Sequence, residues 1–207
     1  MLTSPCIVLD FETTGLSPQH GDRAIEIGAV VIENGIVVDS FQGLMNPGFA
    51  ISSFIESYTG ISNEMVASAP PCGEVMAQFA DFIGDLPLVA HNATFDRRFL
   101  DAELAAIGRK RRAEMACSML AARRVFPDAP NHRLGTLVRY CGLPTDGTFH
   151  RALADAQMAA HLWQAMIDEI SGRYRLRDVS FDLMCRLSRV PRAMVPTFLA
   201  RAAAGQG

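Results

Sequence analysis

The stretch AIEIGAVVIENGIVVDSFQGL, residues 24–44, decides the fold of this 207-residue chain. Two runs rich in β-branched residues, 24–32 and 36–44, flank the tripeptide Glu33-Asn34-Gly35. An Asn-Gly pair between two such runs is a strong β-hairpin signal, because both residues tolerate the left-handed backbone of a tight turn. The sequence therefore predicts an antiparallel pair of strands near the N-terminus.

Segments on both sides of this hairpin extend it into an α/β pattern. Residues 5–10 form a short apolar run typical of a buried strand, and shorter strands are predicted at 86–90 and 113–118. Helical periodicity predicts helices at 62–67, 74–83, 94–107, 118–125, 133–141 and 151–170. Three strands in a meander, followed by alternating helices and strands, predict an α/β domain with a mixed sheet.

The last part of the chain differs in composition. Residues 171–207 carry seven Arg and two Asp, a net charge of +5, whereas the remainder carries twelve basic and twenty acidic side chains, a net charge of −8. Pro191 and Pro196 interrupt this segment, which leaves room for one or two short helices. We expect one domain over residues 1–170 and a basic C-terminal extension over 171–207.

The composition excludes several classes of protein. Apolar residues make up 49% and charged residues 20%, an ordinary balance for a globular domain. No apolar run approaches the roughly 18 residues of a membrane span, and the N-terminus lacks the features of a secretory signal. Five cysteines without a CxxC pair favour reduced thiols over a zinc site or a disulfide framework. We therefore expect a cytoplasmic protein with no membrane partner.

Two carboxylates end the first predicted strand. Asp10 and Glu12 are two residues apart, so strand geometry places both side chains on the same face. Neighbouring carboxylates repel each other unless protons or a cation neutralise them, and hard oxygen ligands suit Mg²⁺ or Mn²⁺. A bare Asp-x-Glu pair is more often a solvated strand end; the Thr-Thr-Gly-Leu that follows favours a metal site instead.

Two further acids and a histidine lie at the boundaries of predicted helices. Asp96, in the segment HNATFD, falls in the first turn of a helix, where an Asp is also ordinary helix chemistry. Asp155, in the segment HRALAD, lies at the edge of an apolar stripe, where an unpaired charge is costly. Each segment alone has such a bland explanation. Together with His150, the four carboxylates suit phosphodiester hydrolysis, in which two metal ions clamp the reacting oxygens and a histidine deprotonates water.

The segments DFETTGL at 10–16, HNATFD at 91–96 and HRALADA at 150–156 resemble, in this order and spacing, the three exonuclease motifs of the DnaQ-like superfamily, DEDDh branch. The resemblance covers roughly residues 5–170, and the motifs are jointly specific although each is weak alone. The superfamily includes DNA polymerase III proofreading (epsilon) subunits, RNase T, oligoribonuclease and exodeoxyribonuclease X. It implies an RNase H-like fold, an α/β architecture whose mixed five-stranded sheet has the order 3-2-1-4-5 and is flanked by helices.

Carried over motif by motif, the resemblance implies a site in which Asp10, Glu12, Asp96 and Asp155 hold two Mg²⁺ or Mn²⁺ ions. His150 would be the general base. Its place five residues before Asp155 is typical of the His branch, since the sister branch has a Tyr four residues before its Asp. No catalytic position departs from the family pattern.

The same resemblance implies the substrate contacts. Three segments supply them, namely the end of the first motif, the loop YTGIS at 58–62 and the second motif. The residues are Thr13, Thr14, Leu16, Tyr58, Ile61, His91 and Phe95. Ordinary loop packing explains Ile61 slightly better than a substrate contact does. Basic runs at 109–112 and 123–124 could track phosphates, although a solvated face is the commoner explanation.

The activity that the resemblance implies is a 3′→5′ exonuclease acting on the 3′ end of single-stranded DNA and releasing nucleoside 5′-monophosphates, in a proofreading or repair-like role. The stretch CSMLAARRVFP at 117–127 is similar to exodeoxyribonuclease X and epsilon-like proteins and favours DNA over RNA. Two alternatives stay open: an RNA-trimming exoribonuclease similar to RNase T or oligoribonuclease, and a scaffolding subunit that binds a DNA polymerase through the basic tail. Many relatives are dimers, so a homodimer is open as well.

Overall fold

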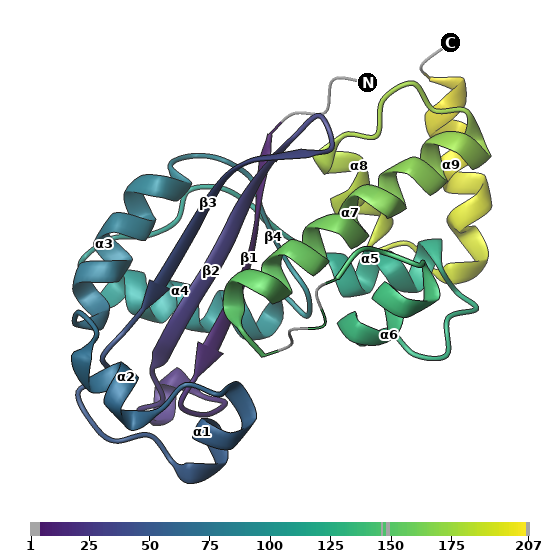
Figure 1. The fold of residues 1–207 in the computed structure, drawn as a ribbon. Helices are drawn as coiled ribbons and strands as arrows, with labels where there is room; N and C mark the ends of the chain where they lie inside the picture. The colour runs from purple at the N-terminus through teal and green to yellow at the C-terminus, as the bar shows by residue number, and fades with distance from the viewer. Residues whose placement is uncertain (1–4, 146, 148–149, 206–207) are drawn as a thin grey trace.

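The computed structural model describes residues 5–145, 147 and 150–205, and a five-stranded sheet in the order β3-β2-β1-β4-β5 forms its centre (Figure 1). The strands β1, β2 and β3 are antiparallel neighbours, whereas β4 runs parallel to β1 and β5 parallel to β4. The order and the mixed directions confirm the predicted sheet. The strands are β1 Cys6–Thr13, β2 Ala24–Glu33, β3 Ile36–Leu44, β4 Leu88–Ala90 and β5 Met115–Cys117.

Each predicted helix is present within a few residues of its expected bounds, and one further helix, α1, was not predicted. The α1 helix is short, begins where the Ser52 hydroxyl accepts from the Ile55 N–H, and ends at Gly60 in a left-handed conformation. The α-helices are α1 Ser53–Thr59, α2 Asn63–Ser68, α3 Cys72–Ile83, α4 Thr94–Ala106, α5 Ser118–Val125, α6 Leu134–Tyr140, α7 Ala152–Tyr174, α8 Phe181–Leu187 and α9 Val195–Ala204, and short 3₁₀ helices span Pro18–His20 and Arg192–Met194. None of the described helices has the length and apolar character needed to cross a bilayer.

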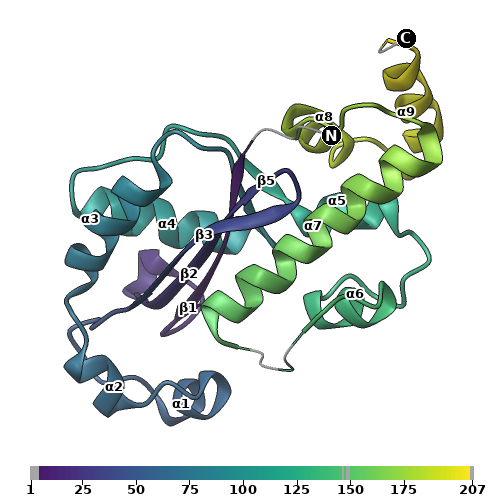
Figure 2. The ribbon, with the colours of Figure 1, turned by 45° about the horizontal axis from the view of Figure 1, so that its top comes forward.

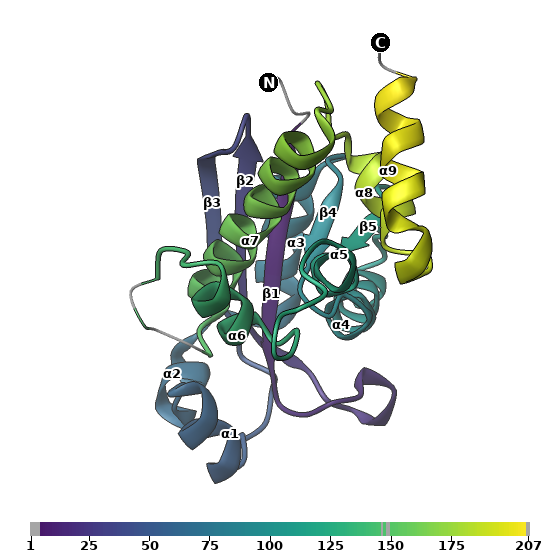
Figure 3. The same cartoon turned by 90° about the vertical axis from the view of Figure 1, so that its right-hand side faces the viewer.

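The central strand β1 divides its side chains between two cores. Ile7 and Leu9 pack with side chains of α3 and α4 on one face of the sheet. Cys6 and Val8 pack with side chains of α7 on the other face, and Figure 3 shows α7 in front of the sheet with α3 and α4 behind it. Because strand residues alternate between faces, Asp10 continues the series that faces α7. The strand also runs past its predicted end at Asp10, so this acid lies within the sheet.

Helix α7 lies against β2 at Gly28. Gly28 is the register partner of Asp10 on β1. A Cβ atom at Gly28 would overlap the backbone of Ala152 and Leu153, so no larger residue fits without displacing the helix. The first turn of α7 therefore rests on the sheet backbone beside Asp10, and its side chains reach the end of β1.

The basic segment 171–207 begins in the last turn of α7 and folds back as α8 and α9, which lie beside the C-terminal end of α7 in Figure 2. Leu183, Met184 and Leu199 join the same core as α7. Arginines of this segment bond to residues 1–170: Arg173 pairs with Glu169 at 2.7 Å, Arg189 pairs with a Glu114 carboxylate at 3.0 Å, and Arg192 donates to the Pro127 carbonyl at 2.7 Å. Part of the positive charge of this segment is thus used within the molecule.

Candidate active site

Four carboxylates and a histidine gather where β1 ends beside the first turn of α7. One oxygen of Glu12, one oxygen of Asp155 and a ring nitrogen of His150 all lie within 4.8 Å of one another. Asp10 lies close enough to feel their charges: burial and then the negative charges of Asp96, Asp155 and Glu12 raise its pKa well above the ordinary value. The structure thus brings together the five residues that the sequence motifs single out, from three separate elements and one loop.

Asp96 reaches this cluster from the first turn of α4. Its Oδ1 accepts a hydrogen bond from the backbone N–H of Phe11 at 3.2 Å, and only 2% of the residue is exposed. Burial raises the Asp96 pKa to about 7. The bond ties α4 to β1 at the residue between Asp10 and Glu12, which holds the Asp96 carboxylate beside the other acids.

His150 and Asp155 are held by a contact between them. The backbone N–H of His150 donates to Asp155 Oδ2 at 2.8 Å, across the start of α7. His150 has a φ of 60°, a left-handed conformation that is uncommon for a residue with a side chain. Such strain persists only where surrounding contacts impose it, and it is frequent at functional sites. The bond to Asp155 is one contact that holds the His150 backbone in this conformation.

The cluster has more negative charge than its protein neighbours neutralise. Burial is the main cause that raises the Glu12 pKa to about 8, and the charges of Asp155, Glu26 and Asp96 add to it, while Arg151 acts in the opposite direction. A cation among these oxygens would relieve the repulsion. Several carboxylate oxygens with one imidazole form a donor set that fits a hard divalent ion. The residues present therefore fit a divalent metal site.

An aromatic stack borders the cluster on the α1 side. The Tyr58 ring lies 4.0 Å from the His150 ring, between centroids, and the Phe54 ring stacks on Tyr58 at 5.7 Å. Both α1 side chains are well exposed, Phe54 at 69% and Tyr58 at 50%. Burial and then the negative charges of the site raise the Tyr58 pKa, and Arg133 is the charge that opposes them. Phe54 and Arg133 were missed in the sequence; the spacing of Phe54 and Tyr58 would have indicated a shared helix face.

The loop after β1 presents a single apolar side chain to solvent. Leu16 is 75% exposed, whereas the hydroxyls beside it are used internally. The Thr13 hydroxyl donates to the Gly15 carbonyl at 2.6 Å, and the Thr14 hydroxyl donates to Asp22 Oδ1 at 3.3 Å. The Thr14 N–H donates to the Arg23 carbonyl at 2.9 Å and the Arg23 N–H donates to the Thr14 hydroxyl at 3.0 Å, and these two bonds close the loop. Leu16 is therefore displayed by a loop with a defined shape, close in sequence to the Glu12 carboxylate.

The other expected substrate contacts lie deeper in the protein. Ile61 has no exposed surface and packs with Ile55. Phe95 is partly buried against Phe99, with ring centroids 5.1 Å apart. Both ring nitrogens of His91 are engaged, Nε2 donating to the His132 carbonyl and Nδ1 bonding to the Ser118 hydroxyl, each at 2.9 Å. Ile61 therefore presents no surface to a substrate in this conformation, His91 has no free ring nitrogen, and Phe95 is only partly exposed.

The basic run at 109–112 is largely matched by acids nearby. Arg109 pairs with Asp81, Arg111 with Asp101 and Arg112 with Asp85. These ion pairs favour the solvated-face explanation of the run over a phosphate track.

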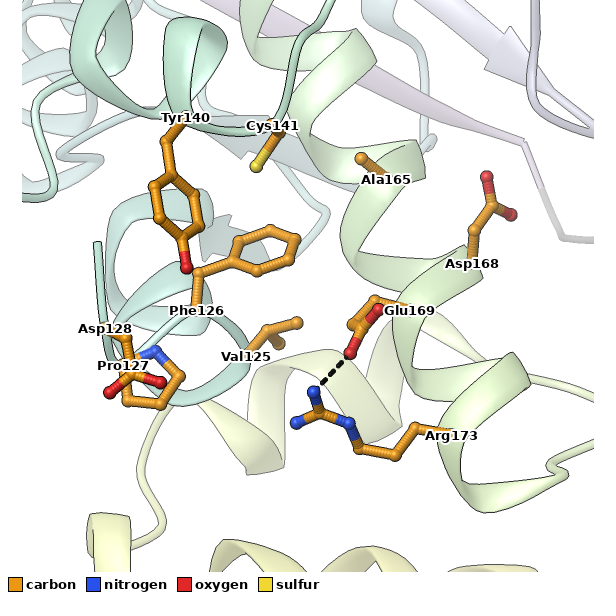
Figure 4. Close-up of a pocket in the computed structure, with 10 residues that line it drawn as sticks. All are labelled: Val125, Phe126, Pro127, Asp128, Tyr140, Cys141, Ala165, Asp168, Glu169 and Arg173. Atoms are coloured by element: carbon orange, nitrogen blue, oxygen red, sulfur yellow. Dashed lines mark ion pairs between the residues drawn. The ribbon is translucent and has the colours of Figure 1, made fainter.

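A cavity of about 690 Å³ lies away from the carboxylates, between α6, the end of α5 and the C-terminal half of α7 (Figure 4). Tyr140 and Phe126 line one side, and the ion pair between Glu169 and Arg173 lines the other. Its nearest α7 residue to the site, Ala165, follows Asp155 by ten residues, or about 15 Å along a helix. The cavity is therefore separate from the carboxylate cluster.

Comparison with known proteins agrees with the exonuclease motifs found in the sequence. The model of the RNase_T family, described as exonuclease, matches residues 7–163. The DNA polymerase III subunit epsilon of Aquifex aeolicus is 32% identical over 179 residues, which cover 86% of this chain and 88% of that protein. The PolC-type DNA polymerase III of Caldanaerobacter subterraneus subsp. tengcongensis is 37% identical over 164 residues, 79% of this chain but only 12% of the relative. The chain thus corresponds to a small part of the PolC-type relatives.

Solved structures with the same fold include exonuclease X in complex with 5′ overhanging duplex DNA. That structure superposes with a TM-score of 0.70 at 27% identity and covers 88% of this chain and 99% of its own. The nuclease domain of 3′hExo, described as a DEDDh family member bound to rAMP, superposes with a TM-score of 0.69 at 20% identity, with 80% and 92% of the two chains covered. The sheet order and these neighbours identify the fold as RNase H-like.

Proposed function

This chain belongs to the RNase_T exonuclease family, and on that premise we propose that it is a 3′→5′ exonuclease. It removes nucleoside 5′-monophosphates from the 3′ end of single-stranded DNA and depends on two Mg²⁺ or Mn²⁺ ions. The observation that carries the proposal is the cluster of Glu12, His150 and Asp155, whose ligand atoms lie within 4.8 Å of one another beside Asp10. Clustered carboxylates with one histidine are the parts that metal-assisted phosphodiester hydrolysis requires.

Each residue has a distinct role in this proposal. The carboxylates of Asp10, Glu12, Asp96 and Asp155 hold the ions, which when bound stabilise the attacking and leaving oxygens. His150 takes the proton of the attacking water as general base. The hydrogen bond from its backbone N–H to Asp155 keeps the His150 imidazole beside the carboxylate oxygens that hold the ions.

The exposed side chains around the cluster hold the DNA end. Leu16 wedges against the last bases, and Tyr58, with Phe54 behind it, offers an aromatic surface for stacking. The backbone at Thr13 and Thr14 holds the terminal 3′-OH. Arg133 binds a phosphate, since its positive charge acts on Tyr58 at the edge of the acidic site. In this arrangement Ile61, His91 and Phe95 pack behind the residues that contact the DNA and hold them in place.

A DNA polymerase is the partner that we propose. The relatives on which this rests are a DNA polymerase III epsilon subunit and PolC-type polymerases, in which the matching segment is part of the polymerase chain. Residues 1–170 then form the exonuclease domain, and the basic segment 171–207 is an extension available for the polymerase contact. The proposal places the enzyme in the cytoplasm, in a proofreading or repair-like role.

A 5′-labelled single-stranded DNA oligomer tests the reaction. With Mg²⁺ we expect a ladder that shortens from the 3′ end, and no ladder with EDTA or with Asp155→Asn, which keeps the shape of the side chain but removes its charge. A matching RNA oligomer is run in parallel. Cleavage of RNA alone would assign the protein to RNA trimming, and cleavage of neither would leave the polymerase-bound scaffold as the better function.

A further inference from the structure

Two buried glutamates, Glu26 and Glu103, each form the same set of hydrogen bonds with a distant segment of the chain. Each accepts two hydrogen bonds from one arginine and a third from the backbone N–H that follows that arginine. The side chains of Glu26 on β2 and Glu103 on α4 are 1% and 3% exposed, and those of their arginines, Arg151 and Arg23, are 35% and 36% exposed. Because geometry and burial match so closely, each pair is a control for the other.

The Glu26 pair holds the start of α7. Arg151 donates from Nη2 to Glu26 Oε1 at 2.8 Å and from Nε to Oε2 at 3.1 Å, and the Ala152 N–H donates to Oε2 at 3.0 Å. Gln42 on β3 adds a fourth bond at 3.0 Å. Arg151 is the N-cap residue of α7 and follows His150 directly. The carboxylate of Glu26 therefore fixes the helix start to the sheet.

The Glu103 pair holds a different segment. Arg23 donates from Nε and from Nη2 to the Glu103 carboxylate, each at 2.8 Å, and the Ala24 N–H donates at 3.1 Å. Arg23 ends the loop that displays Leu16, so this pair ties the loop to α4. Neither Arg23 nor Glu103 is among the main causes of the raised pKa of Asp10 or Glu12.

The position of Glu26 connects its pair to the proposed metal site. Glu26 is the register partner of Glu12, and residues directly opposite each other in antiparallel strands project from the same face. Glu12 on β1 and Asp155 on α7 repel each other, and this repulsion acts to separate the first turn of α7 from the sheet. Gly28, against which the first turn of α7 packs, has no side chain that could form a bond to the helix. The Arg151–Glu26 pair is an attractive contact at the start of α7, and as a pair it adds no net charge.

We propose that Arg151 and Glu26 are positioning residues that hold Asp155 at the spacing from Glu12 that a divalent cation requires and keep His150 beside these ligands. The inference rests on the proposed function. Two substitutions separate positioning from simple electrostatics. Arg151→Met removes a positive charge beside the acids, so electrostatics alone would strengthen cation binding, whereas loss of position weakens it. Arg151→Lys keeps the charge but loses the two-donor fork of the guanidinium.

The test measures Mn²⁺ binding to the full chain without substrate, by electron paramagnetic resonance, for wild type, Arg151→Lys, Arg151→Met and the matched control Arg23→Lys. We expect both Arg151 variants to bind Mn²⁺ about 10- to 100-fold more weakly, the usual cost of losing a residue that orients metal ligands. Arg23→Lys should bind as wild type does. Hydrogen exchange at the amides of 152–156 should accelerate in Arg151→Lys and not in Arg23→Lys.

Unchanged or tighter Mn²⁺ binding by the Arg151 variants would overturn the inference, as would an equal loss in Arg23→Lys. Absence of Mn²⁺ binding by the wild type would instead overturn the proposed function, so the two failures are distinguishable. If Arg151→Met does not fold, Arg151→Lys with the exchange data decides the result, because its exchange readout does not depend on the metal.

Discussion

The ring of Tyr58 lies 4.0 Å from the ring of His150, between centroids, at an interplanar angle of 36°. The contact joins Tyr58 of α1 to a residue 92 positions later in the chain, just before the N-cap of α7. His150 has a left-handed backbone at this point, and the Tyr58 ring packs against its imidazole. Tyr58 therefore offers an exposed surface on which a nucleobase can stack, and it also packs against His150, the proposed general base.

Tyr58→Ala should lower kcat/KM on single-stranded DNA by roughly 2- to 13-fold, because an aromatic contact contributes roughly 0.5–1.5 kcal/mol and each 1.36 kcal/mol changes a rate tenfold. Tyr58→Phe should retain most of the activity, since the ring persists without its hydroxyl. Tyr140→Ala is the matched control, because Tyr140 is similarly exposed but lies beside the separate cavity. A comparable loss in Tyr140→Ala, or none in Tyr58→Ala, would contradict the role of the ring contact.

Gly28→Ala should destabilise the protein by roughly 1–3 kcal/mol, the usual cost of overpacking, because the new methyl group meets the backbone of α7. Gly172→Ala is the opposite case. Gly172 lies in α7 with open space around its Cβ position, so the substitution should stabilise by about 0.5–1 kcal/mol through helix propensity. Urea unfolding of both variants measures the difference, and equal effects would contradict the close approach at Gly28.

Mg²⁺ should raise the melting temperature more at pH 8 than at pH 6. The folded-state pKa values of Glu12 and Asp96, about 8 and about 7, lie above their ordinary values of 4.5 and 3.8. Raised carboxyl pKa values stabilise the metal-free protein at low pH, and this contribution is lost as the pH rises through about 7 to 8. Mg²⁺ competes with these protons, so it binds best where they have left.

Differential scanning calorimetry with and without Mg²⁺ at both pH values measures this effect. Asp96→Asn should reduce the difference between the two pH values, because one titrating ligand is removed. A Mg²⁺-induced shift that is the same at pH 6 and pH 8 would show that these carboxyl groups do not bind the ion.

His91 should make the protein sensitive to mild acid. Burial lowers the His91 pKa to about 4, from an ordinary value of 6.5. Below pH 6.5 His91 is protonated in the unfolded chain but stays neutral in the folded chain, so the free energy of unfolding falls as the pH drops from 6.5 toward 4. The loss between pH 7 and pH 5 is on the order of 2 kcal/mol at 1.36 kcal/mol per unit.

Urea unfolding of wild type and His91→Gln in EDTA isolates this contribution. The variant should lose less stability than wild type between pH 7 and pH 5. His20→Gln serves as control because His20 is exposed, and it should behave as wild type does. A wild-type pH dependence retained in His91→Gln would assign the acid sensitivity to other groups.

The features that could be predicted from the sequence are those whose cause is local. The hairpin at 24–44 follows from its Asn-Gly turn, and strand periodicity places Asp10 and Glu12 on one face. The long helix and the three motifs are likewise visible as short patterns. The strand order followed from the family resemblance of those motifs, and the structure confirms it.

Other features follow from contacts between distant segments. Helix α1 is only seven residues long, so the four-residue spacing of Phe54 and Tyr58 was not recognised as one face of a helix, and the stack of their rings was missed. Ile61 resembles a loop contact in sequence, yet it has no exposed surface because α1 and α2 fold over it.

The sequence by itself determined the kind of chemistry, because the acids and His150 occur in recognisable short motifs. Only the tertiary structure decided how those motifs are held together. In the sequence Glu26 looks like an ordinary charged residue of a strand. The structure shows that Arg151, 125 positions later, donates hydrogen bonds to its carboxylate. Gly28 matters only because α7 rests on it. Distances between elements depend on packing and on buried ion pairs, and no local pattern in the chain encodes them.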